Sequence, residues 1–123
     1  MTESMNVGWK LEPEDRERLL LRFPPAFPDL EADHVTLGKR EALPKEVDAK
    51  VVGYASDGSG LECLAIAIDG ETARPDGSVF HITWSLDKQA GRRAIQSNDL
   101  LKGQGFIELD HPIAIQLWPS VLE

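Results

Sequence analysis

Two histidines, each followed two positions later by a threonine, are the residues of this sequence best suited to chemistry. The first pair is His34 and Thr36, and the second, 47 positions further on, is His81 and Thr83. In an extended strand, side chains two residues apart point to the same face of the sheet. The spacing therefore predicts two strands, each presenting one imidazole and one hydroxyl on the same face.

Two imidazoles on opposite sides of one phosphorus atom could catalyse the hydrolysis of a phosphodiester. Histidine titrates near neutrality, so one ring can take a proton from water while the other gives a proton to the departing oxygen. A threonine hydroxyl sits on a stiff, branched side chain and can donate a hydrogen bond to a phosphoryl oxygen. These roles need no metal ion or other cofactor, and the sequence leaves open which histidine is the base.

The two motifs and their surroundings resemble the two-histidine (2H) phosphoesterase superfamily and, more narrowly, its compact, Swiss Army Knife-like members associated with RNA repair. The resemblance spans roughly residues 30 to 117 and is carried by three stretches, Asp33–Leu37, Phe80–Leu86 and Ser97–Leu101. The short spacing between the histidines implies a reduced lobe and a more open cleft than in larger members.

The resemblance implies a metal-independent hydrolase that opens a 2′,3′-cyclic phosphate on an RNA end or on a nucleotide. It implies that His34 and His81 act as general acid and base, and that Thr36 and Thr83 bind the substrate phosphate. The implied partner is a small nucleotide or an RNA terminus, and no cofactor or metal is implied.

Four residues outside the motifs are further candidates for contact with the substrate. By alternation Ser85 shares the face of the second motif, and Tyr54 could stack on a base. Arg92 could steer an anionic substrate. Lys39, just after the first motif strand, could help to hold a phosphate, although a solvated loop explains it better. Trp84 alternates with the second motif and is expected in the core.

Other interpretations of the same residues remain open. A non-catalytic module with the same fold would use the cleft to bind a phosphorylated ligand, a nucleotide or a partner protein without forming a product. A metal site would combine His34 and His81 with an acid such as Asp33. Zinc sites usually take three or four ligands, however, and on a strand Asp33 would face away from His34. Both motifs also fit ordinary residues of a sheet.

Two helices are expected to support the predicted strands. Pro13 suits the first position of a helix that runs to Phe23, and the acidic residues after it favour the positive end of the helix dipole. Ser97 is expected to cap a second, short helix that runs through Lys102. Residues 1–9 carry no clear pattern and are expected to be loose.

Alternating and apolar segments predict antiparallel strands, and with two helices they predict a single α+β domain, residues 1–123, with sheets around a central cleft. The turn signal at Ser56–Gly60 predicts a hairpin whose second strand is buried on both faces. A polar loop is expected at Lys39–Pro44, and a bend at Asp110–Pro112. His111 lies in this bend and is expected at the surface. The predicted strands are Ala32–Gly38, Val47–Ala55, Leu61–Ile68, Val79–Leu86, Phe106–Leu109 and Ile113–Trp118.

Composition restricts the class of protein. The chain has 123 residues, of which 41% are hydrophobic and 28% charged, as expected for one globular domain. The longest apolar run, Leu64–Ile68, is too short to cross a bilayer, and Met1–Asn6 lacks the layout of a secretory signal, so a cytoplasmic monomer without membrane contact is expected. A net charge of −8 disfavours binding to long nucleic acid but permits a small anionic substrate in a local basic pocket. The single cysteine, Cys63, is expected to be buried.

Overall fold

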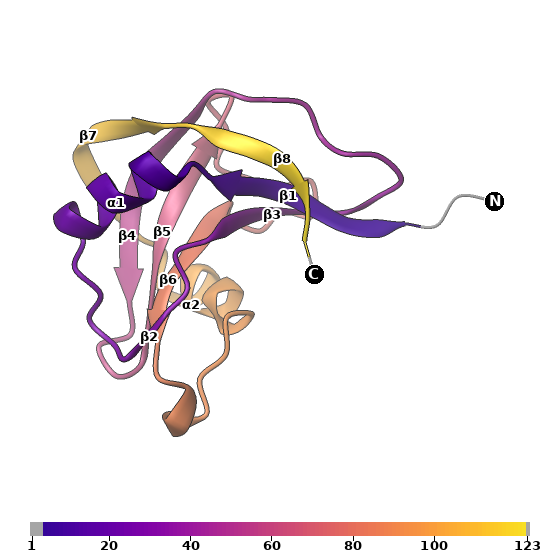
Figure 1. The fold of residues 1–123 in the computed structure, drawn as a ribbon. Helices are drawn as coiled ribbons and strands as arrows, with labels where there is room; N and C mark the ends of the chain where they lie inside the picture. The colour runs from indigo at the N-terminus through magenta and orange to yellow at the C-terminus, as the bar shows by residue number, and fades with distance from the viewer. Residues whose placement is uncertain (1–3, 123) are drawn as a thin grey trace.

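The fold is known from a computed structural model, which describes residues 4–122. It confirms the predicted α+β class, with two antiparallel sheets of three and five strands and two α-helices (Figure 1). No helix in this part of the chain is long and apolar enough to cross a lipid bilayer. The elements in chain order are β1 (Met5–Leu11), α1 (Pro13–Arg22), β2 (Asp29–Leu30), β3 (His34–Arg40), β4 (Ala49–Ser56), β5 (Leu61–Ile68), β6 (His81–Leu86), a 3-10 turn (Lys88–Ala90), α2 (Gln96–Gln104), β7 (Ile107–Ile115) and β8 (Leu117–Val121).

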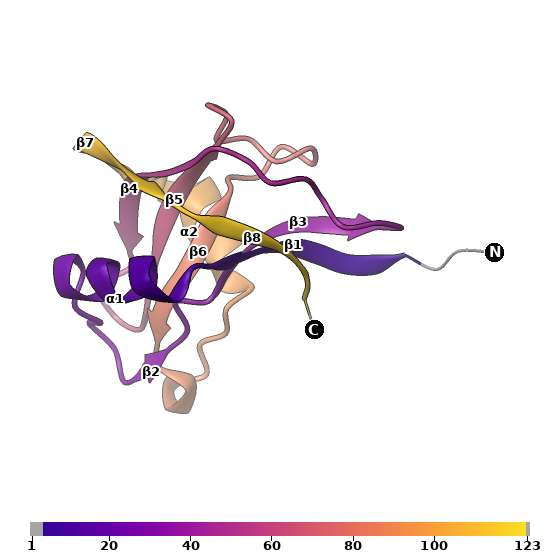
Figure 2. The ribbon, with the colours of Figure 1, turned by 45° about the horizontal axis from the view of Figure 1, so that its top comes forward.

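Two runs of chain connect the sheets. The three-stranded sheet has the order β3-β1-β8, and the five-stranded sheet has the order β2-β6-β5-β4-β7. Residues 29–40 form β2 at one edge of the larger sheet and then β3 at one edge of the smaller. Residues 107–121 form β7 and β8 at the other two edges, and Figure 2 shows them as one run across both sheets. The sheets are therefore joined through the chain at both edges.

The core lies between the two sheets and under α1. All eight residues of β5 are buried, which confirms the predicted burial on both faces. One face of β5 carries Leu64 and Ile66 into the main apolar cluster, which also holds Leu19 of α1. The other face carries Cys63 into a smaller cluster with Leu101 of α2. The two helices thus cover opposite faces of the larger sheet, as Figure 1 shows.

The expectation that residues 1–9 are loose is wrong for most of that segment. Residues 5–11 form β1, the central strand of the smaller sheet. Its inward side chains are Val7, Trp9 and Leu11, which are 0%, 3% and 6% exposed. The period of two was present in the sequence, but an asparagine, a glycine and one charged residue, Lys10, alternate with the apolar residues and weaken the strand signal. Residues 1–3 of that expectation lie outside the described residues.

Three predicted boundaries are also corrected. The residues expected to begin a loop at Lys39 instead extend β3. Ile95 occupies the N-cap of α2 without a side-chain cap, while Ser97 lies inside the helix and is fully buried. The bend expected at Asp110–Pro112 lies within one continuous strand, because β4 pairs with both ends of β7 and the register shifts between Val51 and Gly53. Pro112, which has no N–H to donate, falls in the unpaired middle.

One carboxylate, Glu62 on β5, is buried beneath the proline-rich segment that follows α1, with only 1% exposed. It accepts hydrogen bonds from the Tyr54 hydroxyl at 2.6 Å, from the Ala26 backbone N–H at 2.8 Å and from the Ser85 hydroxyl. Such bonds offset the cost of removing a charge from water. The network therefore fastens the segment after α1 to β4, β5 and β6.

Because the chain contains a single tyrosine, this network can be titrated directly. Burial, assisted by the adjacent Glu62 carboxylate, raises the pKa of Tyr54 from 10.0 to about 12. The folded hydroxyl holds its proton more tightly than the unfolded chain does, so the free energy of unfolding should fall as the pH rises between these two values. Tyrosinate absorbance should show the raised midpoint, and a Glu62→Gln variant should lower it. A midpoint near 10.0 in the native protein would contradict the network.

Candidate active site

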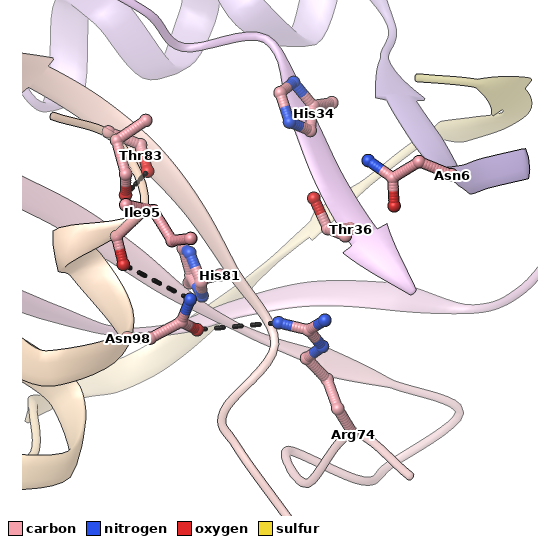
Figure 3. Close-up of a pocket in the computed structure, with 9 residues that line it drawn as sticks. Asn6, His34, Thr36, Arg74, His81, Thr83, Ile95 and Asn98 are labelled. Carbon is pink, nitrogen blue, oxygen red and sulfur yellow. Dashed lines mark hydrogen bonds between the residues drawn. The ribbon is translucent and has the colours of Figure 1, made fainter. Parts of the chain in front are cut away.

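The fold brings all four motif side chains to one cavity. The cavity has a volume of about 450 Å³ and is lined by His34 and Thr36 from β3 and by His81 and Thr83 from β6. Figure 3 shows the two pairs on opposite walls. The residues between the motif positions, among them Val35, point the other way into the core. The alternation predicted for each motif is therefore confirmed.

The opposition of the two motif strands depends on a change of direction between β2 and β3. Before the change, the chain continues to pair with β6, since the Ala32 N–H donates to the Thr83 carbonyl at 2.9 Å. Ala32 then adopts a left-handed conformation with φ 46°, which costs an alanine about 1–2 kcal/mol. Arg16 of α1 donates a hydrogen bond to the Ala32 carbonyl at 2.7 Å. After this turn the chain no longer pairs with β6. It forms β3, which pairs with β1, and this divergence opens the space between the motifs.

His81 is held as a neutral ring. Its Nδ1 lies 2.9 Å from the Val79 carbonyl oxygen, so Nδ1 carries the hydrogen and Nε2 keeps its lone pair. Burial lowers the pKa of His81, and the positive charges of Arg74 and His34 lower it further, although the bond to Val79 acts in the opposite direction. The ring can therefore accept a proton near neutral pH.

His34 is oriented by a carboxylate. Its Nδ1 lies 3.1 Å from Oδ2 of Asp33, and Lys10 donates to the same oxygen at 3.2 Å. Although burial opposes the effect, the hydrogen bonds from Lys10 and His34 hold the pKa of Asp33 below its usual value, so Asp33 is ionised. The expectation that Asp33 faces away from His34 is wrong, because β3 begins at His34 and Asp33 precedes the strand.

The two motif threonines differ in their partners. The Thr83 hydroxyl lies 2.9 Å from the Ser97 hydroxyl and donates to the Ala94 carbonyl at 3.3 Å, so α2 positions it. The Thr36 hydroxyl makes no hydrogen bond to any residue in the part of the chain described. Thr36 therefore presents its donor to the cavity, while Thr83 would exchange the longer of its bonds for one to a ligand.

Arg74 lines the cavity and was not predicted as a site residue from the sequence. It lies between β5 and β6, and its side chain lines the cavity with only 11% exposed. Its contacts are long: 3.5 Å to Asn98 Oδ1, 3.5 Å to the Leu37 carbonyl and 3.8 Å to Asp76. Its Nε is buried and has no partner among residues 4–122. A guanidinium with unused donors at a cavity wall is suited to bind an oxyanion.

The signal for Arg74 in the sequence is weak. The stretch Arg74–Gly77 fits a turn, and its arginine precedes the second motif without belonging to it. Two amides, Asn6 of β1 and Asn98 of α2, also line the cavity, and neither is prominent in the sequence. Asn98 falls within the third stretch of the resemblance noted above. These three residues come from distant parts of the chain, so only the fold reveals that they meet.

The four further candidate contacts lie away from the cavity. Ser85 is turned into the core by a bulge in β6, where the register shifts between the partners of Thr83 and Ser85, and it bonds to Glu62 instead. Tyr54 also bonds to Glu62 and stacks on the ring of Phe23 at the end of α1, on the far face of the larger sheet. Neither residue lines the cavity between the motifs.

The two candidate cations are also placed elsewhere. Arg92 forms an ion pair with Asp57 and donates to Gln96 at 3.0 Å. Lys39 is exposed on β3 beyond the cavity, opposite Asn6 of β1. Among the residues that line the cavity, the positive charge therefore comes from Arg74 rather than from the residues predicted.

Within residues 4–122, no three histidine, cysteine, aspartate or glutamate side chains are grouped so that they could hold a metal ion. Burial raises the pKa of the Cys63 thiol to about 12, so it would not act as a nucleophile.

The chain matches no model of a known protein family, no curated protein and no solved structure. The function is therefore inferred from the geometry of the cavity.

The effect of the Arg74 charge should be measurable as a change in the pKa of His81. We expect nuclear magnetic resonance titration to give a His81 pKa below the ordinary value of 6.5. Replacing Arg74 by methionine, which keeps most of the volume, should raise that pKa without restoring it fully, because burial is the larger cause.

A matched Arg92→Met variant serves as the control, because Arg92 is paired with Asp57 away from the cavity. It should leave the His81 titration unchanged. An unchanged His81 pKa in the Arg74 variant would show that the guanidinium does not act on this ring.

Proposed function

We propose that this protein is a metal-independent phosphoesterase that hydrolyses a cyclic phosphodiester, with the 2′,3′-cyclic phosphate of an RNA end or a nucleotide as its substrate. One observation carries the proposal: the two histidine–threonine pairs line opposite walls of a single cavity of about 450 Å³. A phosphoryl group in that cavity would have an imidazole on either side and the Arg74 guanidinium beside it (Figure 3). The same observation supports membership of the 2H superfamily, which the motifs resemble.

His81 is the base in this proposal. Its Nδ1–H is held by the Val79 carbonyl, which leaves Nε2 to accept a proton from water. Burial, with the charges of Arg74 and His34, keeps the ring neutral at the pH at which it must work. A general base must be unprotonated to act and is most effective when its pKa lies near the working pH.

His34 is the acid. The Asp33 carboxylate accepts the Nδ1–H of this ring and can stabilise the imidazolium, so that Nε2–H is available to donate. In the reaction, the water oxygen forms a bond to phosphorus, and the bond from phosphorus to one ribose oxygen breaks. The proton of water goes to His81 Nε2, and the proton of His34 Nε2 goes to the departing ribose oxygen. The product is a phosphate monoester.

Negative charge on the phosphoryl oxygens would be stabilised by hydrogen bonds from Arg74 and the two threonines. Arg74 offers a buried Nε–H that has no partner among residues 4–122, and two long, weak bonds that a ligand could replace. Thr36 offers a hydroxyl on the other wall. Donors that are already in place and shielded from water stabilise developing charge more strongly than donors in solution.

A second candidate is a binding module that holds a phosphorylated ligand without turnover. It is favoured by the Thr83 hydroxyl, which is occupied by Ser97 and Ala94 rather than directed only to the cavity. Such a module would show saturable binding of a nucleotide with no product formed. Equilibrium binding measured beside product analysis separates the two functions.

Turnover should require both histidines and tolerate a chelator. We expect His34→Ala and His81→Ala each to lower kcat by about 10²-fold or more on a 2′,3′-cyclic nucleotide or an RNA ending in a cyclic phosphate. The pH profile between about 5 and 9 should be bell-shaped. Its acid limb should lie below 6.5, because His81 has a lowered pKa and activity falls as it gains a proton.

A His111→Ala variant is the control, because His111 is exposed on β7 and lies outside the cavity. It should retain full activity. Loss of turnover on chelation, or full activity in the His34→Ala, His81→Ala double variant, would refute the mechanism.

Arg74 should contribute to turnover more than to folding. We expect Arg74→Ala to lower kcat/KM by about 10²-fold, mostly through kcat, as for the loss of one donor to a developing oxyanion. Arg74→Lys keeps the charge but loses the planar fork, so it should recover only part of the activity. Added guanidinium should partly rescue the alanine variant. Equal activity in Arg74→Ala and Arg92→Ala would exclude this role.

A further inference from the structure

The outer face of the three-stranded sheet places a third tryptophan in line with the proposed acid. Lys10 on β1 pairs with His34 on β3 on one side and with Trp118 on β8 on the other. Side chains of directly opposed residues in antiparallel strands project from the same face. His34, Lys10 and Trp118 therefore form one row across the face that borders the cavity.

Trp118 differs from the other two tryptophans. Trp9 and Trp84 are 3% and 0% exposed, and their indole N–H groups donate to backbone carbonyls at 2.9 Å and 2.7 Å. Trp118 is 47% exposed, and no acceptor for its indole N–H occurs within the described part of the chain. Its ring is thus neither part of the core nor fixed by a hydrogen bond. An exposed, rigid aromatic face beside a polar cavity is suited to contact a ligand.

The separation between the cavity and Trp118 suits a nucleotide. Adjacent strands in a sheet lie about 4.8 Å apart, so the His34 and Trp118 backbones are separated by roughly 10 Å. The intervening residue, Lys10, is held down by its bond to Asp33 at 3.2 Å. A cyclic phosphate placed at His34 can extend its ribose over Lys10 and its base towards the indole.

We propose that Trp118 is the stacking surface for the base of the substrate, which makes the substrate a nucleotide or RNA end rather than a cyclic phosphate without a base. The inference rests on the proposed function, since it takes the phosphate to lie at His34. Stacking uses the ring face that every base possesses, so the enzyme should accept different bases with similar affinity.

One competing position for the base lies across the cavity. Ile95, at the start of α2, is 68% exposed and lines the cavity on the wall of the larger sheet. An aliphatic side chain can cover a base, but it has no ring face on which the base can stack. Ile95→Ala therefore serves as the comparison variant for Trp118→Ala.

The kinetic experiment compares adenosine 2′,3′-cyclic phosphate with glycerol 1,2-cyclic phosphate, which has the same cyclic diester and no base. We expect Trp118→Ala to raise KM for the adenosine substrate about 10-fold with little change in kcat, a loss within the range of base stacking. Trp118→Phe should retain most of the affinity, and kcat/KM for the glycerol substrate should not change. Ile107→Ala, an exposed apolar residue on β7, is the control.

A binding experiment separates this inference from the proposed function. Adenosine 2′-monophosphate should quench the fluorescence of Trp118, and the quenching should disappear in Trp118→Phe, in which the two buried tryptophans remain. Quenching without turnover of any cyclic phosphate would refute the proposed function and uphold this inference.

Three results would overturn the inference. The first is normal turnover with an unchanged KM in Trp118→Ala. The second is a raised KM in Ile95→Ala alone, which would place the base on α2. The third is fluorescence that depends on protein concentration and not on nucleotide, which would assign the indole to contact between two copies of the chain.

Discussion

The candidate site depends on one run of backbone that pairs with two different strands in succession. Residues 29–32 bond to β6, and residues 34–40 bond to β1. Between them Ala32 takes a left-handed conformation, and α1 holds its carbonyl through Arg16. If the run had continued along β6, the first motif would have been a neighbour in the same sheet and no cavity would separate the imidazoles. The space for a substrate is thus a consequence of strand divergence, and the helix that stabilises the divergence is itself packed into the core.

The electrostatics of the cavity contrast with those of the whole molecule. The chain carries a net charge of −8, yet the cavity is lined by Arg74 and two imidazoles. The adjacent carboxylate, Asp33, is shared between Lys10 and His34 and so adds little negative potential. Under the proposed function, such a molecule would repel long polyanions in general and accept one phosphoryl group at one place. The two imidazoles also sit in different surroundings, which is the condition for one to serve as base and the other as acid.

Local patterns in the sequence predicted much of the fold and the centre of the site. Alternation predicted the face to which each motif points, and an almost continuous apolar run predicted the burial of β5 on both faces. Turn residues predicted the hairpin of β4 and β5. The predictions that were wrong concern features that depend on pairing between strands far apart in the sequence. The bulge that turns Ser85 inward is invisible without the partner strand, and Asp33 reaches His34 only because the strand starts two residues later than predicted. Arg74 enters the cavity from a connection whose path is set by the fold, so its residue type alone could not mark it.

The bulge in β6 also divides that strand into two regions whose side chains face different surroundings. Before it, His81 and Thr83 face the cavity, whereas Ser85 after it faces the Glu62 network. Because the change of facing occurs at one extra residue, substitutions upstream alter the lining of the cavity, and substitutions downstream alter how firmly the segment after α1 is attached. Deleting that residue would place Thr83 and Ser85 next to each other, opposite the adjacent residues Cys63 and Glu62, so the strand would become regular while the downstream side chains kept their present face. In a lineage of such proteins, ligand preference could therefore diversify along one half of a strand while the other half preserved the interior.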